Sequence, residues 1–414
     1  MQPPSRTRNV LAGGRRLSST KRQASPMRTV ARGGQGLTSA TRHAPPRTER
    51  ELRYRRLRHA MHDASLDGLL AFAPGWRREH VHYLAGAGVR ASFAFAYLPL
   101  AGDPLAFVAG AADAAGVAAA GWVADVRPLA GRGVAAAIAA GRPARLGVAH
   151  LELLPAALLE PLRAGLDGVE IVSATRLMSL VELVKSPWEH ERVRAAAAVC
   201  DAGWEAFVAC LRAGLAEYEV VAAVEAELRR GGAEDNFMLI ASGGDDVRGM
   251  TPPGPRRLGP GDMVRTELTP RLGGYYAQIC RSAVLGPAGH GQRRSFALFA
   301  EALEAGLGAV RSGVTAHDVA MAQNDVFRRH GLGEYTTSRY TRVRGHGHGL
   351  HPDEAPPIVE GEETVLEEGA VVIVHPNTFT PLAGYHVLGD PVIVTAAGHE
   401  PLLRTERRLW EVEP

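Results

Sequence analysis

Two segments of the chain repeat a strand, a turn and a second strand, and each carries one polar side chain in an apolar strand. Glu267 lies six positions after Gly261, and His375 lies six positions after Gly369. A buried polar side chain in a central strand needs a partner, because leaving it unpaired costs free energy. The duplicated spacing therefore predicts that both side chains point at one site. The alternative is that both residues end edge strands and have no chemical role. The expected strands cover residues 261–267 and 275–285 in one copy and residues 369–375 and 385–394 in the other.

A histidine-rich tract lies between the two segments. His346, His348 and His351 fall within six residues, and the glycines between them let the backbone approach a ligand closely. Such a tract indicates metal binding only by its composition, and surface histidines are the commoner explanation. Asp353 and Glu354 follow the tract, and their carboxylates could bind a cationic or amino group of a substrate.

The elements that must position these residues begin with an alternation of helices and strands. A helix is expected from Glu49 to His62, followed by a buried strand that starts at Gly68. Short apolar runs then alternate with alanine-rich helical stretches as far as Thr175. This alternation predicts an α/β domain.

A helix start marks the second folded part. Ser186 can cap the helix, Pro187 suits its first position, and Glu189 stands three residues after the cap, as a capping box requires. A further helix is expected at residues 217–230, because two glycines follow it. Two helices are thus expected before each strand–turn–strand segment, which indicates a duplicated helix–helix–strand–strand unit.

The composition narrows the classes of protein. The 414 residues are enough for two or three domains, and 46% of them are hydrophobic. No run of about 18 uncharged apolar residues occurs, so no membrane span is expected. Three cysteines are too few for a disulfide framework and indicate a reducing compartment, which predicts a cytoplasmic protein. The only lysines are Lys21 and Lys185, and this excludes a Walker A loop and disfavours a lysine Schiff base.

Positive charge is concentrated at the N-terminus. Residues 1–50 hold eleven Lys or Arg and one acidic residue, Glu49, so their net charge is +10 in a chain of total charge +3, which leaves −7 for the remainder. Large apolar side chains are nearly absent there, so residues 1–48 are expected to form a disordered tail, with a transit peptide or a nucleic-acid-binding arm as alternatives. The folded body is not expected to bind nucleic acid.

Several motifs together resemble the pita-bread family that includes methionine aminopeptidase, Xaa-Pro aminopeptidase and dipeptidase, and creatinase. The segment His80-Val-His-Tyr-Leu-Ala-Gly resembles the family's Asn-Ile-Arg-Tyr-Leu-Thr-Gly, and Lys185-Ser-Pro-Trp-Glu resembles its Lys-Ser-Pro-x-Glu. His346-Gly-His-Gly-Leu matches the His-Gly-Ile/Val-Gly-Leu signature, and Glu354-x-Pro matches the end of His-Glu-x-Pro. The resemblance covers about residues 50–414. It implies a creatinase-like α/β domain over residues 49–180, a pita-bread domain over residues 183–414, and a homodimer.

The chain departs from the family at the metal ligands. The family's peptidases hold two divalent metals with Asp, Asp, His, Glu and Glu, and the matching positions here are Glu267, Gln278, His346, His375 and Gly389. The resemblance therefore implies that both bridging carboxylates are replaced, by Gln278 and Gly389. Two cations close together need such anions to offset their repulsion. The family's two substrate-pocket histidines are replaced as well, by Met250 and Asp353.

We therefore expect an enzyme that has lost the dimetal peptidase centre and needs no cofactor. His346 and His375 would act as acid and base, Glu267 would orient one of them, and Gln278 would donate to a developing anion. The substrate would be a small amino-acid derivative, and hydrolysis of a C–N bond, elimination and rearrangement all suit the pocket. The predicted substrate-binding residues are Asp353, Glu354, Met250, His348 and His386.

Two other hypotheses stay open. Glu267, His346 and His375 make up the two-histidine, one-carboxylate set of a mononuclear site for iron, zinc or manganese. A non-catalytic peptide-binding module is the other alternative, in which the basic tail would hold a partner. A binding surface would gain nothing from a histidine buried in a strand, which argues against this last hypothesis.

Overall fold

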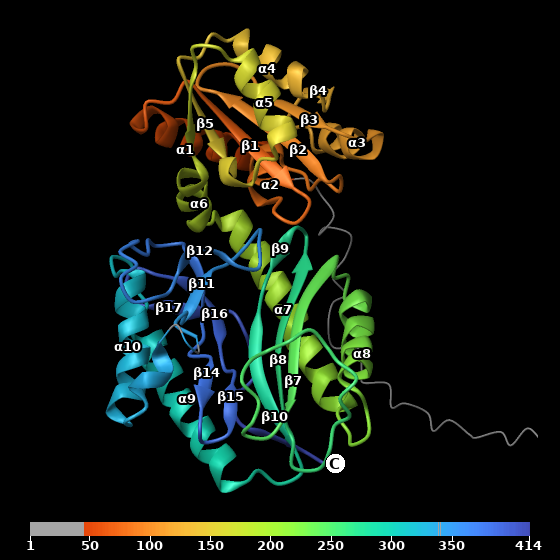
Figure 1. The fold of residues 1–414 in the computed structure, drawn as a ribbon, viewed down its shortest axis with the longest axis vertical. Coiled ribbons are helices and arrows are strands. Elements are labelled where there is room, and N and C mark those ends of the chain that lie inside the picture. Colours follow the sequence, from red (N-terminus) through yellow and green to blue (C-terminus); the bar gives the residue numbers. More distant parts are fainter. Residues whose placement is uncertain (1–44, 338, 340) are drawn as a thin grey trace, which may run out of the picture. The chain divides into compact units, whose positions relative to one another are not determined.

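The computed structural model describes residues 45–337, 339 and 341–414, and Figure 1 shows their fold. Residues 1–44 of the predicted tail lie outside the described residues. The first helix starts at Arg47, two residues before the predicted start at Glu49. Within the described part of the chain, no helix combines the length and the apolar character that crossing a bilayer requires.

A six-stranded mixed sheet forms the N-terminal region, with the strand order β4-β3-β2-β1-β5-β6. Strand β1 pairs antiparallel with β2 and parallel with β5, so it lies inside the sheet. All seven residues of β1, Gly68–Pro74, are buried, as the apolar run predicts. The elements in chain order are α1 (Arg47–Asp63), β1 (Gly68–Pro74), α2 (Glu79–Ala85), β2 (Phe93–Pro99), β3 (Leu105–Val108), α3 (Ala111–Ala120), β4 (Asp125–Pro128), α4 (Gly131–Ala139), β5 (Arg145–Ala149), η2 (Leu151–Leu153), α5 (Ala156–Gly165), β6 (Glu170–Ser173) and α6 (Thr175–Leu183).

Two larger sheets and four long helices form the C-terminal region. One sheet has the order β18-β10-β8-β7, with β9 paired to β8, and the other has the order β12-β11-β13-β16-β17. The helices are α7 (Pro187–Cys210), α8 (Glu217–Arg230), α9 (His290–Ala309) and α10 (Ala316–Arg329), with the short η3 (Gly333–Thr336). The strands are β7 (Asp235–Gly243), β8 (Met263–Leu272), β9 (Tyr275–Tyr276), β10 (Ile279–Leu285), β11 (Gly345–Gly347), β12 (Glu354–Pro357), β13 (Val371–Val374), β14 (Thr378–Thr380), β15 (Gly384–His386), β16 (Asp390–Val394), β17 (His399–Pro401) and β18 (Trp410–Val412).

The predicted helix start at Ser186 is confirmed. The Ser186 hydroxyl accepts from the Glu189 backbone N–H at 3.1 Å, and the Glu189 carboxylate accepts from the Ser186 N–H at 2.9 Å. Pro187 occupies the first helical position. The cap fixes where α7 begins, and α8 covers the predicted residues 217–230.

The expected duplication is present but less regular than the sequence suggests. Helices α7 and α8 precede β8 and β10, and α9 and α10 precede β13 and β16. The second copy differs in its last strand, which was expected to be continuous from Tyr385. It is broken, because β15 pairs with β14 in a separate two-stranded sheet and only β16 pairs with β13. The two large sheets meet where Cys280 and Gly389 form an isolated bridge.

Candidate functional site

The four predicted catalytic residues come from both copies of the duplicated unit. Glu267 lies within β8, and Gln278 lies in the short link between β9 and β10. His346 is the middle residue of β11, which pairs with β13. His375 was expected inside a strand but follows the last residue of β13, and its backbone N–H donates to the Arg344 carbonyl oxygen at 3.1 Å.

Glu267 is held by two side-chain amides. Asn377 donates from Nδ2 to Glu267 Oε1 at 2.8 Å, and Gln278 donates from Nε2 to Glu267 Oε2 at 3.5 Å. Burial raises the pKa of Glu267 to about 7, although the hydrogen bond from Asn377 acts in the opposite direction. A carboxyl group that titrates near neutral pH can accept and release a proton under ordinary conditions. Among the described residues, no hydrogen bond joins Glu267 to either histidine. Glu267 was expected to orient one of them, but in this structure its carboxylate contacts amides instead.

The two predicted catalytic histidines face each other. Their ring centroids are 5.3 Å apart at an interplanar angle of 66°. His346 donates from Nδ1 to the carbonyl oxygen of Gly347 at 2.9 Å, and Asp353 Oδ1 lies 3.8 Å from the same nitrogen. A carbonyl can only accept, so Nδ1 carries a proton and Nε2 is the atom left for chemistry.

His375 is a neutral imidazole with an unused nitrogen. Burial lowers its pKa well below the usual range, and the neighbouring His346 lowers it further. Its Nδ1 is buried and has no hydrogen-bond partner. This nitrogen is therefore available for a hydrogen bond with a substrate group.

Gly389 has no room for a side chain. A Cβ atom there would lie 2.5 Å from the His375 Cβ and 2.9 Å from the Val374 carbonyl oxygen. Real Cβ atoms do not approach other atoms so closely. The side chain of His375 therefore stands in the space that a larger residue at position 389 would need.

Met250 lies in a group of apolar side chains. It packs with Tyr385 against the buried cluster formed by Cys280, Ile373 and Val387. Burial raises the pKa of the Cys280 thiol well above its usual range, so this residue stays protonated. Cys280 pairs with Glu267 across β10 and β8, so this apolar cluster lies beside the polar residues of the candidate site.

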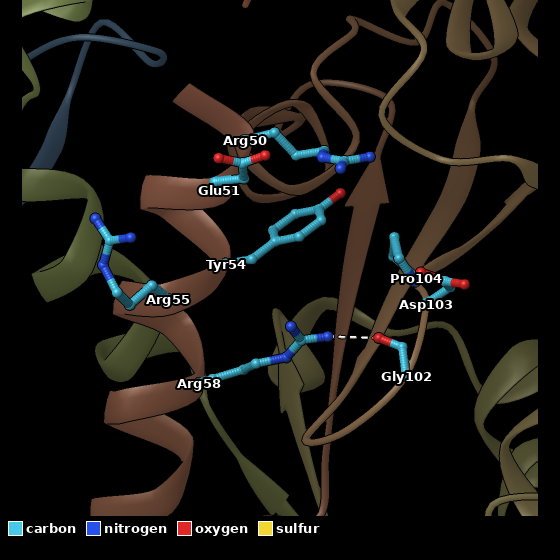
Figure 2. Close-up of a pocket in the computed structure, with 8 residues that line it drawn as sticks. All are labelled: Arg50, Glu51, Tyr54, Arg55, Arg58, Gly102, Asp103 and Pro104. Atoms are coloured by element: carbon cyan, nitrogen blue, oxygen red, sulfur yellow. Dashed lines mark hydrogen bonds between the residues drawn. The ribbon is translucent and has the colours of Figure 1, made fainter. Parts of the chain in front are cut away.

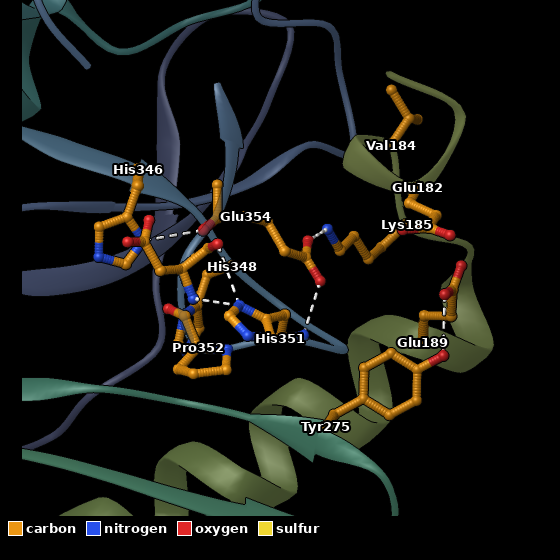
Figure 3. A network of polar contacts seen from close by, with 12 residues as sticks. Glu182, Val184, Lys185, Glu189, Tyr275, His346, His348, His351, Pro352 and Glu354 are labelled. Atoms are coloured by element: carbon orange, nitrogen blue, oxygen red, sulfur yellow. Dashed lines mark hydrogen bonds and ion pairs between the residues drawn. The ribbon is translucent and has the colours of Figure 1, made fainter. Parts of the chain in front are cut away.

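Glu354 is engaged in a buried ion pair. Lys185 donates from Nζ to Glu354 Oε2 at 2.7 Å, and the other carboxylate oxygen accepts from the His351 backbone N–H at 3.0 Å (Figure 3). The side chains of Lys185 and Glu354 are 1% and 7% exposed. A substrate cation would therefore meet a carboxylate that is already paired, whereas Asp353 is exposed and lies beside His346.

The remaining predicted histidines differ in position. His348 is buried, and its ring centroid lies 6.1 Å from that of His346; burial lowers its pKa to about 3. His386 packs on α9, where its ring stacks on Phe299 at 4.7 Å and its Nδ1 lies 3.1 Å from the Ser295 hydroxyl. His386 is thus placed in the core beside α9.

Two features escaped the sequence analysis. Asn377 fixes Glu267, and its Oδ1 also accepts from the Leu388 N–H at 2.9 Å. Its position two residues after His375 was the only available signal. The second feature is a buried group in the N-terminal region, formed by Glu79, His80 and His150.

That group is the one whose ligand atoms converge. Among the residues that the structure describes, it is the only set of three His, Cys, Asp or Glu side chains whose ligand atoms all lie within 4.8 Å of one another. Glu267, His346 and His375, the ligands considered for a mononuclear metal, do not form such a set.

A surface depression elsewhere holds none of these residues. It lies in the N-terminal region beside α1, where Arg58 donates to the carbonyl oxygen of Gly102 (Figure 2). The lining residues are Arg50, Glu51, Tyr54, Arg55, Arg58, Gly102, Asp103 and Pro104.

Comparison with known proteins identifies the family. The model of the metallopeptidase family M24 matches residues 191–396, and that of the creatinase/prolidase N-terminal domain matches residues 53–183. The protein named probable dipeptidase PepE in Mycobacterium tuberculosis is 30% identical over 352 residues, which are 81% of this chain and 89% of that protein. The chain belongs to the M24 family.

Other M24 relatives are also peptidases. An Xaa-Pro dipeptidase of Pyrococcus furiosus is 29% identical over 231 residues, which are 55% of this chain and 65% of that protein, slightly under two thirds. The crystal structure of dipeptidase PepE from Mycobacterium ulcerans superposes with a TM-score of 0.75 at 27% identity, over 89% of this chain and 99% of that one. Family and fold were therefore predicted correctly, with a creatinase-like α/β domain before a pita-bread domain. The relatives are hydrolases.

Proposed function

We propose that the pocket around Glu267, His346 and His375 hydrolyses a C–N bond in a small amino-acid-derived substrate by acid–base chemistry, without a dinuclear metal centre. The observation that carries the proposal is the closed space at Gly389, because a side chain that could bridge two cations has no place there.

The donor set does not fit two cations. Bridging two divalent ions requires anionic groups between them, and Gln278 is neutral while Gly389 has no side chain. Gln278 Oε1 is also buried without a hydrogen-bond partner. His375, a neutral imidazole, stands where its relatives' pattern has a further carboxylate. These three positions together support a pocket that works through its own side chains.

The proposed roles follow from the contacts. Glu267 in its ionised form takes a proton from a water molecule, whose oxygen attacks the carbon of the C–N bond. His346 in its doubly protonated form delivers a proton from Nε2 to the departing nitrogen, while its Nδ1–H stays on the Gly347 carbonyl oxygen. The proton that Glu267 took from water then returns to Nε2, which restores both groups. Gln278 and Asn377 hold the Glu267 carboxylate in place. Acid and base are thereby separate residues with different surroundings.

The substrate class is inferred from the surroundings of His346 and from the relatives. Asp353 offers an exposed carboxylate for an amino group, and Met250 and its cluster offer an apolar wall for a side chain. The names of the relatives, dipeptidase and Xaa-Pro dipeptidase, support a substrate of one or two residues. The homodimer and the cytoplasmic location stay predictions.

Metal counting combined with hydrolysis assays tests the proposal. We expect dipeptides and N-acyl amino acids to be hydrolysed at the same rate before and after loading with Mn²⁺, and His346→Ala to lose this activity. Exposed His330 provides the control His330→Ala. The proposal is overturned if the wild-type protein binds two equivalents of Mn²⁺, loses both in His346→Ala, and is active only when loaded.

A further inference from the structure

A buried group in the N-terminal region has the composition of a metal site. Glu79 and His80 are the first two residues of α2, and His150 follows the last residue of β5. These residues are 2%, 1% and 1% exposed. One ligand atom from each lies within 4.8 Å of the others. Two imidazoles and one carboxylate therefore converge in the interior, although Glu79 and His150 are 71 positions apart in the chain.

Each of the three side chains has a buried atom without a hydrogen-bond partner, although Arg77 donates to Glu79 Oε1 and His150 Nε2 lies 3.4 Å from that oxygen. Glu79 Oε2, His80 Nε2 and His150 Nε2 are buried and have no hydrogen-bond partner. An unpaired polar atom in the interior costs free energy, and three of them in one place are unusual. A single cation among these side chains would give the two imidazoles and the carboxylate a common partner.

The other atoms of the two imidazoles are fixed by partners. His80 Nδ1 lies 2.9 and 3.0 Å from the two carboxylate oxygens of Glu182, and His150 Nδ1 lies 2.9 Å from the carbonyl oxygen of Phe72. The Phe72 carbonyl and an ionised Glu182 carboxylate can only accept, so in the neutral rings Nδ1 carries the proton and Nε2 offers the lone pair. Metal-binding histidines show this arrangement, in which a carboxylate or carbonyl orients the ring from behind.

The backbone of His150 is strained in a way that suits a ligand position. Its φ is 61°, in the left-handed region that residues other than glycine seldom adopt. Its backbone N–H donates to the Thr175 hydroxyl at 2.8 Å. Strain of this kind persists where the surrounding structure fixes the residue, and such residues cluster at functional sites.

From the three converging atoms and their oriented rings, we infer that Glu79, His80 and His150 bind one divalent cation of the zinc class. Two histidines and one carboxylate suit zinc, which takes four ligands and here keeps one open position. Glu79 also lines a cavity with Arg78 and His82. The cation ties α2 to the end of β5 and, through Glu182, to α6.

Co²⁺ serves as the probe, because its visible absorption reports four-coordinate binding. The full chain is stripped with a chelator, loaded with Co²⁺ and desalted, and bound metal is measured together with the spectrum. We expect about one equivalent in the wild-type protein. In His80→Asn and in His150→Asn the affinity falls more than about 100-fold. Asparagine is chosen because the resembling family segment has Asn at the His80 position and because Asn tolerates the left-handed backbone at His150.

Two further variants separate this site from the pita-bread pocket. Glu182→Gln, which leaves all three ligands in place, weakens Co²⁺ binding by about 10 to 100-fold if Glu182 orients His80. His346→Ala keeps the full equivalent. The inference is overturned if the wild-type protein binds no Co²⁺, or if His80→Asn binds it as tightly as the wild type. Metal that is lost in His346→Ala but kept in His80→Asn also overturns it, and only this last result contradicts the metal-free pocket as well.

Discussion

The pita-bread pocket and the buried group of the N-terminal region contain the same three side-chain types, two histidines and one glutamate. In the pocket, the glutamate is held by the amides of Asn377 and Gln278, and no three ligand atoms of the described residues converge there. In the N-terminal region the atoms converge, and Glu182 and the Phe72 carbonyl hold the rings from behind.

The difference shows that residue types alone do not define a metal site. What matters is which atoms are left without partners and which partners orient the others. Both carboxylate oxygens of Glu267 accept from amides, whereas only one oxygen of Glu79 accepts from Arg77 and its Oε2 has no hydrogen-bond partner. The two proposed roles, proton transfer at Glu267 and metal binding at the buried group, rest on this difference.

The strongest test of this contrast changes the glutamate of the pocket. Glu267→Gln keeps the size of the side chain but removes the proton-accepting oxygen, and we expect kcat to fall by about 10² to 10⁴-fold. Steady-state hydrolysis assays measure the effect. Exposed Glu205 gives the matched control Glu205→Gln, which should leave kcat unchanged. If Glu267→Gln keeps full activity, the pocket and the buried group do not differ in the way proposed.

Thermal unfolding tests the comparison through stabilisation of the protein by Zn²⁺. Zn²⁺ at 100 times its dissociation constant should stabilise the wild-type protein by about 2.7 kcal/mol, because it binds the folded state only. Differential scanning calorimetry with and without Zn²⁺ measures the shift in Tm. The shift should vanish in His80→Asn and persist in His375→Ala. The reverse pattern would place the cation in the pocket.

A smaller effect is expected at the glycine that closes the pocket. Gly389→Ala puts a methyl group against His375, and overpacking of this kind costs about 1–3 kcal/mol in the free energy of unfolding. Urea denaturation measures the loss. Gly88→Ala is the control, since a Cβ there has no atom within 4 Å. Equal stabilities of the two variants would show that position 389 can accept a side chain.

The pH dependence of kcat gives the last test of the comparison. Burial raises the pKa of Glu267 to about 7, so the carboxylate is protonated below this pH and ionised above it. If it acts as the base, kcat rises as the pH increases through about 7 and falls about tenfold for each unit below. Glu267→Gln should lose this dependence. A wild-type rate that is constant between pH 5 and pH 8 contradicts the role of Glu267.

Local signals explain the parts of the fold that the sequence predicted well. The cap at Ser186 is a contact between residues three apart, and the end of α8 follows from two adjacent glycines, so both can be identified from a short stretch of chain. The uniformly apolar strand β1 is buried because it lies inside its sheet. The cap and the helix end do not depend on distant residues, and the apolar run of β1 is itself local.

Other parts depend on contacts that no short stretch contains. The last strand of the second copy is broken because residues 384–386 pair with β14, which the apolar pattern does not reveal. Glu79 and His150 meet only because β5 pairs with β1, whose end leads toward α2. Asn377 meets Glu267 only through the joining of two sheets. The resemblance located the pocket positions, but their partners came from the fold.

The pairing of Lys185 with Glu354 has a practical consequence for labelling chemistry. Lys185 is one of two lysines in the chain, and its amine is buried. An amine-selective acylating reagent should therefore leave it unmodified while the protein is folded. The rate of acylation at Lys185, followed by mass spectrometry, therefore measures how often the segment between α6 and α7 opens.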